Sequence, residues 1–169
     1  MARREREHKT NALRELDAAG VAYEARPYDD DLDHDEVPAR DYGARIAGAL
    51  GEDPDAVFKT IVCVAPSGGH VVCCVPVACE VDLKRAAAAA GEKSLALLPI
   101  RELERVTGYV RGGCSPVGMR RAFPTIIDET ATLFARIGVS GGRRGLQVLV
   151  DPEELARFCG ATFADIARG

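Results

Sequence analysis

Two apolar runs joined by a short glycine turn constrain the fold of this chain most. Residues Val57–Val64 and Val71–Ala78 are rich in β-branched side chains, and Ser67–Gly69 lies between them. This pattern is typical of a β-hairpin. Side chains alternate between the two faces of a strand, and both faces of the first run are apolar apart from Lys59 and Thr60. An inward lysine must be paired, deprotonated or facing a ligand. The alternative is that Lys59 lies near the strand start and reaches water.

The remaining elements follow from helical spacing, capping residues and further strand-like runs. Helices are predicted over residues 10–19, 39–50, 83–90, 99–106 and 152–159, and strands over 21–28, 94–98, 125–128, 133–139, 146–150 and 161–166. The acidic run 29–36 is predicted to be a loop. Many closely spaced strands with single helices between them predict an α+β fold. We expect one compact domain over residues 1–169, with a mixed, mostly antiparallel, barrel-like β-sheet flanked by helices.

Length and charge limit the class of protein. The 169 residues suit one domain, and no apolar run approaches 18 residues. The first residues lack the apolar segment of a secretory signal, so we expect a cytoplasmic protein without a membrane span. The net charge is −4, yet residues 101–144 carry eight arginines against four acidic residues. This region could meet phosphates, and the alternative is a solvated surface of mixed charge.

Several common chemistries do not fit the sequence. The six cysteines lie mostly in apolar runs, and Cys74 and Cys79, a C-x4-C pair, have no second short pair to complete a zinc site, so we expect reduced core thiols, no metal and no cofactor. Residues 138–142 read G-x-S-x-G, but the three histidines, at 8, 34 and 70, all precede this serine. The same lack of a later histidine argues against a Cys-His pair at Cys114. No phosphate-binding P-loop motif is present.

Two glycine-rich stretches are the candidate binding loops. Gly108–Gly118 contains four glycines and a Ser-Pro step, and Ser140–Gly145 contains three glycines and two arginines. Glycine lets the backbone take positive φ, and consecutive N–H groups in such turns can hold an anion or a carbonyl. The alternative is a pair of tight turns without a ligand.

Four ordered motifs resemble a known family. They are Val57–Thr60, Thr107–Gly118, Phe123–Asp128 and Val139–Leu146. With them the chain, from about Leu13 to Arg168, resembles the YbaK/ProX aminoacyl-tRNA deacylases, relatives of the editing domain inserted in bacterial prolyl-tRNA synthetase. The resemblance implies hydrolysis of the ester between an amino acid and the 3′ end of tRNA, chiefly cysteine on the proline tRNA. It implies tRNA and prolyl-tRNA synthetase as partners, and neither DNA nor a membrane.

The resemblance also assigns site residues. Lys59 is the expected catalytic residue, placed to pair with the terminal adenosine's phosphate or ribose. Expected substrate-binding residues are Tyr28, Tyr42, Thr60, Gly112, Gly113, Ser115, Pro116, Ser140, Gly141, Gly142 and Gln147. Some members carry aspartate where this chain has Gln147, which cannot act as a carboxylate.

The same resemblance implies that the substrate's own thiol attacks its carbonyl in cysteine-specific members. Two alternatives stay open from the sequence. One is an alanyl-tRNA(Pro) deacylase, and the other is a non-catalytic module that binds an aminoacyl or nucleotide group.

Overall fold

The β2–β3 hairpin is the centre of the fold. In the computed structural model, which describes residues 9–30 and 39–169, β2 (Phe58–Val64) pairs antiparallel with β3 (His70–Pro76) and places Lys59 opposite Val75. The predicted hairpin is confirmed. Three further strands complete a five-stranded sheet of order β5-β2-β3-β6-β9: β5 (Ala96–Leu97), β6 (Thr125–Asp128) and β9 (Thr162–Ala164).

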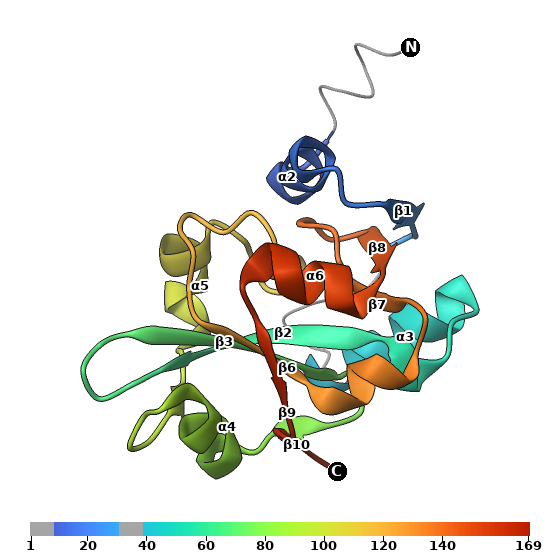
Figure 1. Ribbon diagram of the computed structural model, residues 1–169. Coiled ribbons are helices and arrows are strands. Elements are labelled where there is room, and N and C mark those ends of the chain that lie inside the picture. Colours follow the sequence, from blue (N-terminus) through green and yellow to red (C-terminus); the bar gives the residue numbers. More distant parts are fainter. Residues whose placement is uncertain (1–8, 31–38) are drawn as a thin grey trace.

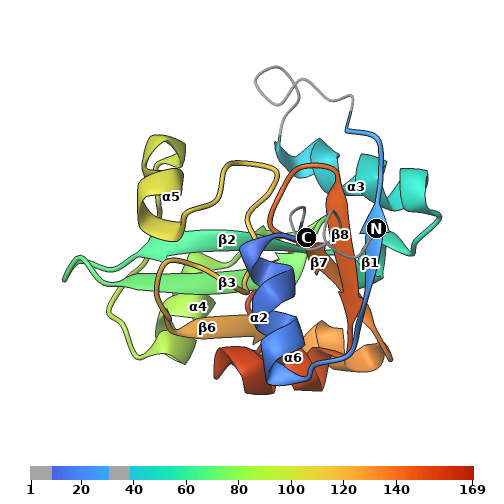
Figure 2. The same ribbon diagram turned by 90° about the horizontal axis from the view of Figure 1, so that it is seen from above.

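Two smaller sheets accompany the central one. The first has the order β1-β8-β7 and contains β1 (Tyr23–Pro27), β7 (Ile137–Ser140) and β8 (Leu146–Val150). Figure 2 shows it crossing the hairpin, to which an isolated bridge between Val57 and Gly138 ties it. The second pairs β4 (Glu80–Val81) with β10 (Ala167–Arg168).

The pairing matches the predicted mixture of strand directions. Five of the seven strand pairings are antiparallel, and the pairings β3–β6 and β6–β9 are parallel. No closed barrel is found among residues 9–30 and 39–169, so the barrel-like closure of the sheet is not confirmed. The α+β class is confirmed, and it comes with three separate sheets.

The five predicted helices are found within one residue of their expected bounds: α2 (Asn11–Ala19), α3 (Ala39–Leu50), α4 (Leu83–Ala90), α5 (Ile100–Thr107) and α6 (Pro152–Cys159). Their ends have the expected capping chemistry. The side chains of Thr10, Asp82 and Asp151 accept backbone N–H groups at three N-termini. None of the described helices has the length and apolar character needed to span a bilayer.

Two predicted strands differ in the structure, and Asp128 is the cause of both differences. Residues Glu129–Leu133 form a 3-10 helix (η2) because the Asp128 carboxylate accepts the N–H of Thr130. The predicted strand 133–139 is therefore reduced to β7. In place of the predicted strand 161–166 the structure has β9 and β10. The same carboxylate accepts the N–H of Ile166, which lies between the two strands, and that of Ala167, which begins β10.

Other boundaries shift less. The strands predicted over 21–28 and 94–98 are the shorter β1 and β5, with β1 at an edge of its sheet as expected. A second short 3-10 helix (η1, Pro54–Ala56) precedes β2. Most of the predicted acidic loop, residues 31–36, lies outside the described residues.

Both faces of the central sheet are buried. On one face Val62 and Val72 pack in a cluster with Leu16 of α2 and Leu155 of α6. On the other face a second cluster includes Ala86 of α4. Figure 1 shows α4 on one side of the hairpin and α2 and α6 on the other. Burial of this apolar area is the main stabilising contribution to the fold.

The cysteines take part in this packing. All six thiols are free, and Cys63, Cys73 and Cys74 of the hairpin are fully buried. Burial raises the pKa of Cys74, and of Cys114 and Cys159, to about 12. A thiol with such a pKa stays protonated at neutral pH and acts as a small apolar side chain.

Gly113 brings the two glycine-rich loops together. A Cβ atom at Gly113 would lie 2.9 Å from the Cα atom of Arg143 and 3.0 Å from the backbone N of Arg144. Because those atoms belong to the backbone, they cannot turn aside as a flexible side chain would. We expect Gly113→Ala to lower the free energy of unfolding by about 1–3 kcal/mol, as overpacking does. Urea titration measures this change.

Gly69→Ala is the matched control for this prediction. A Cβ atom at Gly69 would meet only the Oγ of Ser67, at 3.5 Å, which is an ordinary contact. We therefore expect that control to unfold close to wild type. If both variants unfold alike, the two loops are not held together at Gly113.

Candidate active site

A cleft of about 450 Å³ opens beside β2, where the two glycine-rich loops approach the strand. Its lining includes the β2 residues 58–62, Gly112 and Cys114 of the first loop, and Ser140 at the end of β7. Six residues predicted from the sequence line it: Tyr28, Lys59, Thr60, Gly112, Ser140 and Gln147. The structure thus brings together residues from four distant parts of the chain.

The other predicted residues take different positions. Gly113, Ser115, Pro116, Gly141 and Gly142 belong to the two loops but do not line the cleft. Tyr42 lies in α3, and its side chain is outside the described part of the structure. Burial raises the pKa of the Tyr28 phenol above its ordinary value, so this side chain enters the cleft neutral.

Lys59 is half-buried and has no carboxylate within ion-pair distance among the described residues. Burial lowers the pKa of its ammonium group, and the nearby Glu80 carboxylate opposes this shift. Phe58, the first residue of β2, is 2% exposed, so the residue directly before Lys59 belongs to the core. The sequence left open whether Lys59 faces a ligand or reaches bulk water, and its place in the cleft favours a ligand.

The first glycine-rich loop uses some of its backbone N–H groups internally and leaves two beside the cleft. Among those used, the N–H of Gly113 donates to the Val110 carbonyl at 2.9 Å, and the N–H of Val117 donates to the Ser115 hydroxyl at 3.2 Å. Ser115 is fully buried and shapes this turn. Within the described residues, the N–H groups of Gly112 and Cys114 donate no hydrogen bond, and both residues line the cleft. These two groups remain available to a ligand.

The second glycine-rich loop uses its donors internally. The N–H of Gly141 donates to the Leu146 carbonyl at 2.9 Å, and the N–H of Gly142 donates to the Ser140 hydroxyl at 3.2 Å. Gly142 has φ +99 and lies against Thr10 and Tyr109, so it needs both the positive φ and the lack of a side chain. This loop therefore supports the wall of the cleft, and Ser140 is its only predicted member that lines it.

Gln147 lies in front of a buried carboxylate. The residue is 4% exposed, and its amide nitrogen, in the orientation that satisfies both groups, donates to both Glu52 oxygens at 2.7 Å. Arg26 Nη1 approaches Glu52 Oε1 at 3.3 Å. Burial raises the pKa of Glu52, while Arg26 acts to lower it. Gln147 is thus a neutral group of the cleft wall with its orientation fixed by a carboxylate behind it.

Several lining residues were missed by sequence reasoning. Glu52 was missed because nothing in the sequence pairs it with Gln147. Within residues 9–30 and 39–169, Arg111 and Arg168 add two positive charges to that of Lys59, and Glu80 adds one negative charge. An apolar wall comes from Ile61, Leu97, Leu98, Ile100 and Leu103. Leu97 and Ile100 are 58% and 56% exposed, and this exposure could not be read from the sequence, where both residues belong to predicted regular elements.

The buried Glu52 carboxylate predicts a pH effect on stability. Because its folded pKa lies above its unfolded value, its contribution to the free energy of unfolding is greatest below the unfolded pKa and falls as the pH rises through the folded pKa. Glu52→Gln removes this contribution and keeps an amide partner for Gln147. The stability of wild type relative to this variant should fall as the pH rises above about 4, the ordinary pKa of a glutamate in an unfolded chain. Urea titrations at several pH values measure the difference, and a rise would contradict the assigned direction.

The sequence is similar to a known protein family over most of its length. Residues 36–158 match the family model described as the aminoacyl-tRNA editing domain. A protein of Enterococcus faecalis named "Putative Cys-tRNA(Pro)/Cys-tRNA(Cys) deacylase EbsC" is 38% identical over 166 residues, which cover 98% of each chain.

Two solved structures share the fold at low identity. The crystal structure of a hypothetical protein superposes with a TM-score of 0.81 at 22% identity, covering 94% of this chain and 100% of the other. The crystal structure of a "putative trans-editing enzyme for prolyl tRNA synthetase" gives a TM-score of 0.75 at 23% identity, covering 94% and 96%. The family match over most of the chain and the full-length relative together show that this protein belongs to the aminoacyl-tRNA editing domain family.

Proposed function

We propose that this chain removes cysteine from mischarged tRNA, with Cys-tRNA(Pro) as its main substrate, and acts in trans, as a protein separate from the synthetase. The observation that carries the proposal is the half-buried Lys59 in an apolar cleft beside the unused N–H groups of Gly112 and Cys114. The name of the full-length relative supports cysteine as the amino acid. We treat residues 1–169 as one working domain.

Lys59 is the proposed contact to the end of the tRNA. Its ammonium group has lost part of its hydration, so an anion in the cleft would interact with it more strongly than in water. A phosphate or ribose oxygen of the terminal adenosine is the proposed partner. Thr60, next along β2, has its hydroxyl 3.9 Å from the Cys74 thiol and also lines the cleft. This pair of neighbours would fix the ester relative to the glycine-rich loop.

The N–H groups of Gly112 and Cys114 are the proposed donors to the ester carbonyl. As the carbonyl carbon becomes tetrahedral its oxygen gains negative charge, and fixed backbone dipoles stabilise that charge. No histidine is needed for this step because an aminoacyl ester is already activated. Among the described residues, His70 lies at the far end of the hairpin and packs edge-on against Phe123, with ring centroids 5.5 Å apart.

The proposed nucleophile is the thiol of the substrate. The deprotonated sulfur attacks the carbonyl carbon of its own residue, a C–S bond forms, and the C–O bond to the ribose breaks. The ribose hydroxyl leaves with a proton, and the amino acid leaves as a cyclic thiolactone. The protein then needs to supply orientation and charge stabilisation, which can account for much of an acceleration.

Recognition of the tRNA body is proposed to depend on prolyl-tRNA synthetase. The described part of the cleft lining carries three cations, which suffices for the end of the tRNA but gives few phosphate contacts. A synthetase that still holds the tRNA would raise its effective concentration at the cleft.

Replacing Lys59 tests its catalytic role. We expect Lys59→Ala to lower kcat/KM for Cys-tRNA(Pro) by ~100-fold or more, because the desolvated positive charge is lost from the cleft. The release of labelled cysteine measures the rate. Lys84→Ala is the matched control, since Lys84 is an exposed lysine on α4 that does not line the cleft. Turnover of Lys59→Ala at the wild-type rate would remove Lys59 from the mechanism.

The choice of amino acid tests the thiol step. We expect rapid release of cysteine from cysteinyl-tRNA(Pro). Release of the amino acid from the seryl, alanyl and prolyl forms should be slower by ~100-fold or more, since none of these carries a thiol. Serine is the closest control because it replaces only the sulfur by oxygen. Comparable release of alanine would require attack by water and would favour an alanyl-tRNA deacylase. If no form is released, the chain is a binding module.

A further inference from the structure

We propose that Arg168, fixed in place by the buried carboxylate of Asp128, binds a backbone phosphate at the 3′ end of the tRNA, next to the nucleotide held by Lys59. This inference rests on the proposed substrate. It adds a binding residue that lies more than one hundred positions from Lys59 in the sequence, and a positioning residue that does not itself touch the RNA.

Arg168 lies at the mouth of the cleft with a partner that is easily exchanged. Its Nη2 atom is 3.2 Å from Glu80 Oε2, and the two side chains are 61% and 65% exposed. An ion pair this exposed contributes little to stability. A phosphate can therefore replace Glu80 at small cost, and arginine can donate two parallel hydrogen bonds to it. Both Arg168 and Glu80 line the cleft that contains Lys59.

The charge balance of the cleft favours an anion. Among the residues that the structure describes, its charged lining consists of Lys59, Arg111 and Arg168 against Glu80, although the whole chain has a net charge of −4. Glu80 interacts with two cations of the cleft. It pairs with Arg168, and its negative charge also opposes the lowering of the Lys59 pKa by burial. A ligand phosphate that displaced Glu80 would find two cations in reach.

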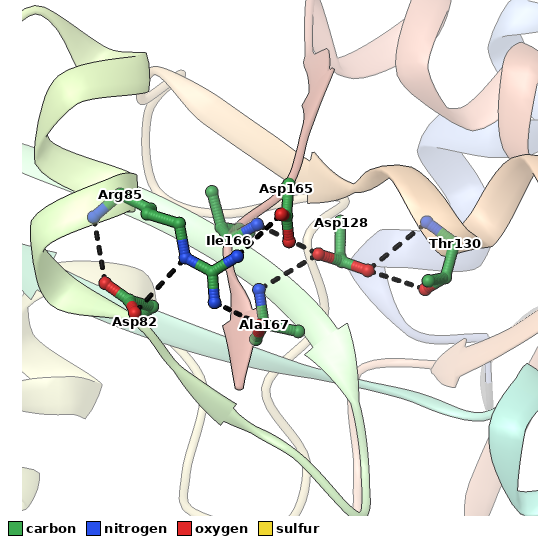
Figure 3. Close-up of polar contacts among 7 residues, drawn as sticks. All are labelled: Asp82, Arg85, Asp128, Thr130, Asp165, Ile166 and Ala167. Carbon is green, nitrogen blue, oxygen red and sulfur yellow. Dashed lines mark hydrogen bonds and ion pairs between the residues drawn. The ribbon is translucent and has the colours of Figure 1, made fainter. Parts of the chain in front are cut away.

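The position of Arg168 is set by contacts to the three residues before it. Asp128 is 1% exposed, and its Oδ1 accepts the N–H groups of Ile166 and Ala167, both at 3.0 Å. Its Oδ2 accepts the N–H of Thr130 at 3.2 Å and the hydroxyl of Thr130 at 2.6 Å. Figure 3 shows Asp128 between Thr130 and the 166–167 backbone.

Arg85 and the core hold the same segment from the other side. Arg85 donates to the Ala167 carbonyl at 2.9 Å and pairs with Asp165 at 2.6 Å, as Figure 3 also shows. The Ile166 side chain is fully buried. Arg168, which follows Ala167, is opposite Glu80 in the β4–β10 pairing. The guanidinium group is thus carried by a fixed backbone, which lowers the entropy cost of binding.

The test measures binding and not turnover, so it gives an answer even if the proposed deacylation is wrong. The probe is a dye-labelled, uncharged RNA with the single-stranded 3′ end of a tRNA, and its affinity is measured by fluorescence anisotropy over a range of salt concentrations. We expect Arg168→Ala to weaken binding about 5-fold and to reduce the slope of log K against log salt by about 0.7, as the loss of one single-strand phosphate contact does.

Arg105→Ala is the matched control. Arg105 is an exposed arginine paired with Glu102 at 3.0 Å, and it does not line the cleft. The control removes the same charge as Arg168→Ala. Because Arg105 lies away from the cleft and makes no phosphate contact there, the salt slope of this variant should stay at the wild-type value. If the two variants change the slope equally, Arg168 acts only through net charge and the proposal is wrong.

Asp128→Asn tests the positioning role through the sign of its effect. Removing a negative charge should strengthen RNA binding if only long-range electrostatics matter. An asparagine cannot accept all four hydrogen bonds, so we expect the 165–168 segment to loosen and binding to weaken, as in Arg168→Ala. Thermal unfolding identifies a variant that fails to fold, in which case Arg168→Ala alone decides. Stronger binding by a folded Asp128→Asn would overturn the positioning role.

Discussion

The structure depends on one strand that is buried on both faces and yet carries a lysine at its second residue. Burial on the two sides of β2 and β3 supplies the apolar contacts of the central sheet, with clusters of buried residues on each face. The same burial removes water from part of Lys59 and lowers its pKa. An anion that approaches a partly dehydrated ammonium group stabilises its charged form. Core packing and ligand binding are thus joined at a single residue.

The loops around Lys59 divide the remaining work between support and binding. The N–H groups of Gly141 and Gly142 donate to Leu146 and Ser140 and not to the cleft, and Gly113 allows the two loops to touch. Gly112 and Cys114, which both line the cleft, donate no backbone hydrogen bond within the described structure. Glycine-rich sequence therefore serves two purposes here. Most of these glycines permit close packing, and one part of one loop offers donors to the cleft.

Buried carboxylates organise the site from behind. Glu52 fixes the amide of Gln147, and Asp128 fixes the segment before Arg168. In both cases a side chain that lines the cleft is oriented by a charged group that does not line it. A neutral glutamine in the wall is then compatible with a nearby negative charge, because Glu52 lies directly behind it and is itself paired with Arg26.

The sequence by itself determined the hairpin, the five helices and the two glycine-rich loops, because alternation, helical spacing, caps and glycines act over a few residues. It did not determine the shortening of the strand predicted over 133–139 or the division of 161–166. Both follow from the Asp128 carboxylate, whose partners lie two and nearly forty residues away. The pairing of Gln147 with Glu52, and of Arg168 with Glu80, likewise depended on strands that meet only after folding. Contacts between distant residues have no local pattern, so only the tertiary structure decided them.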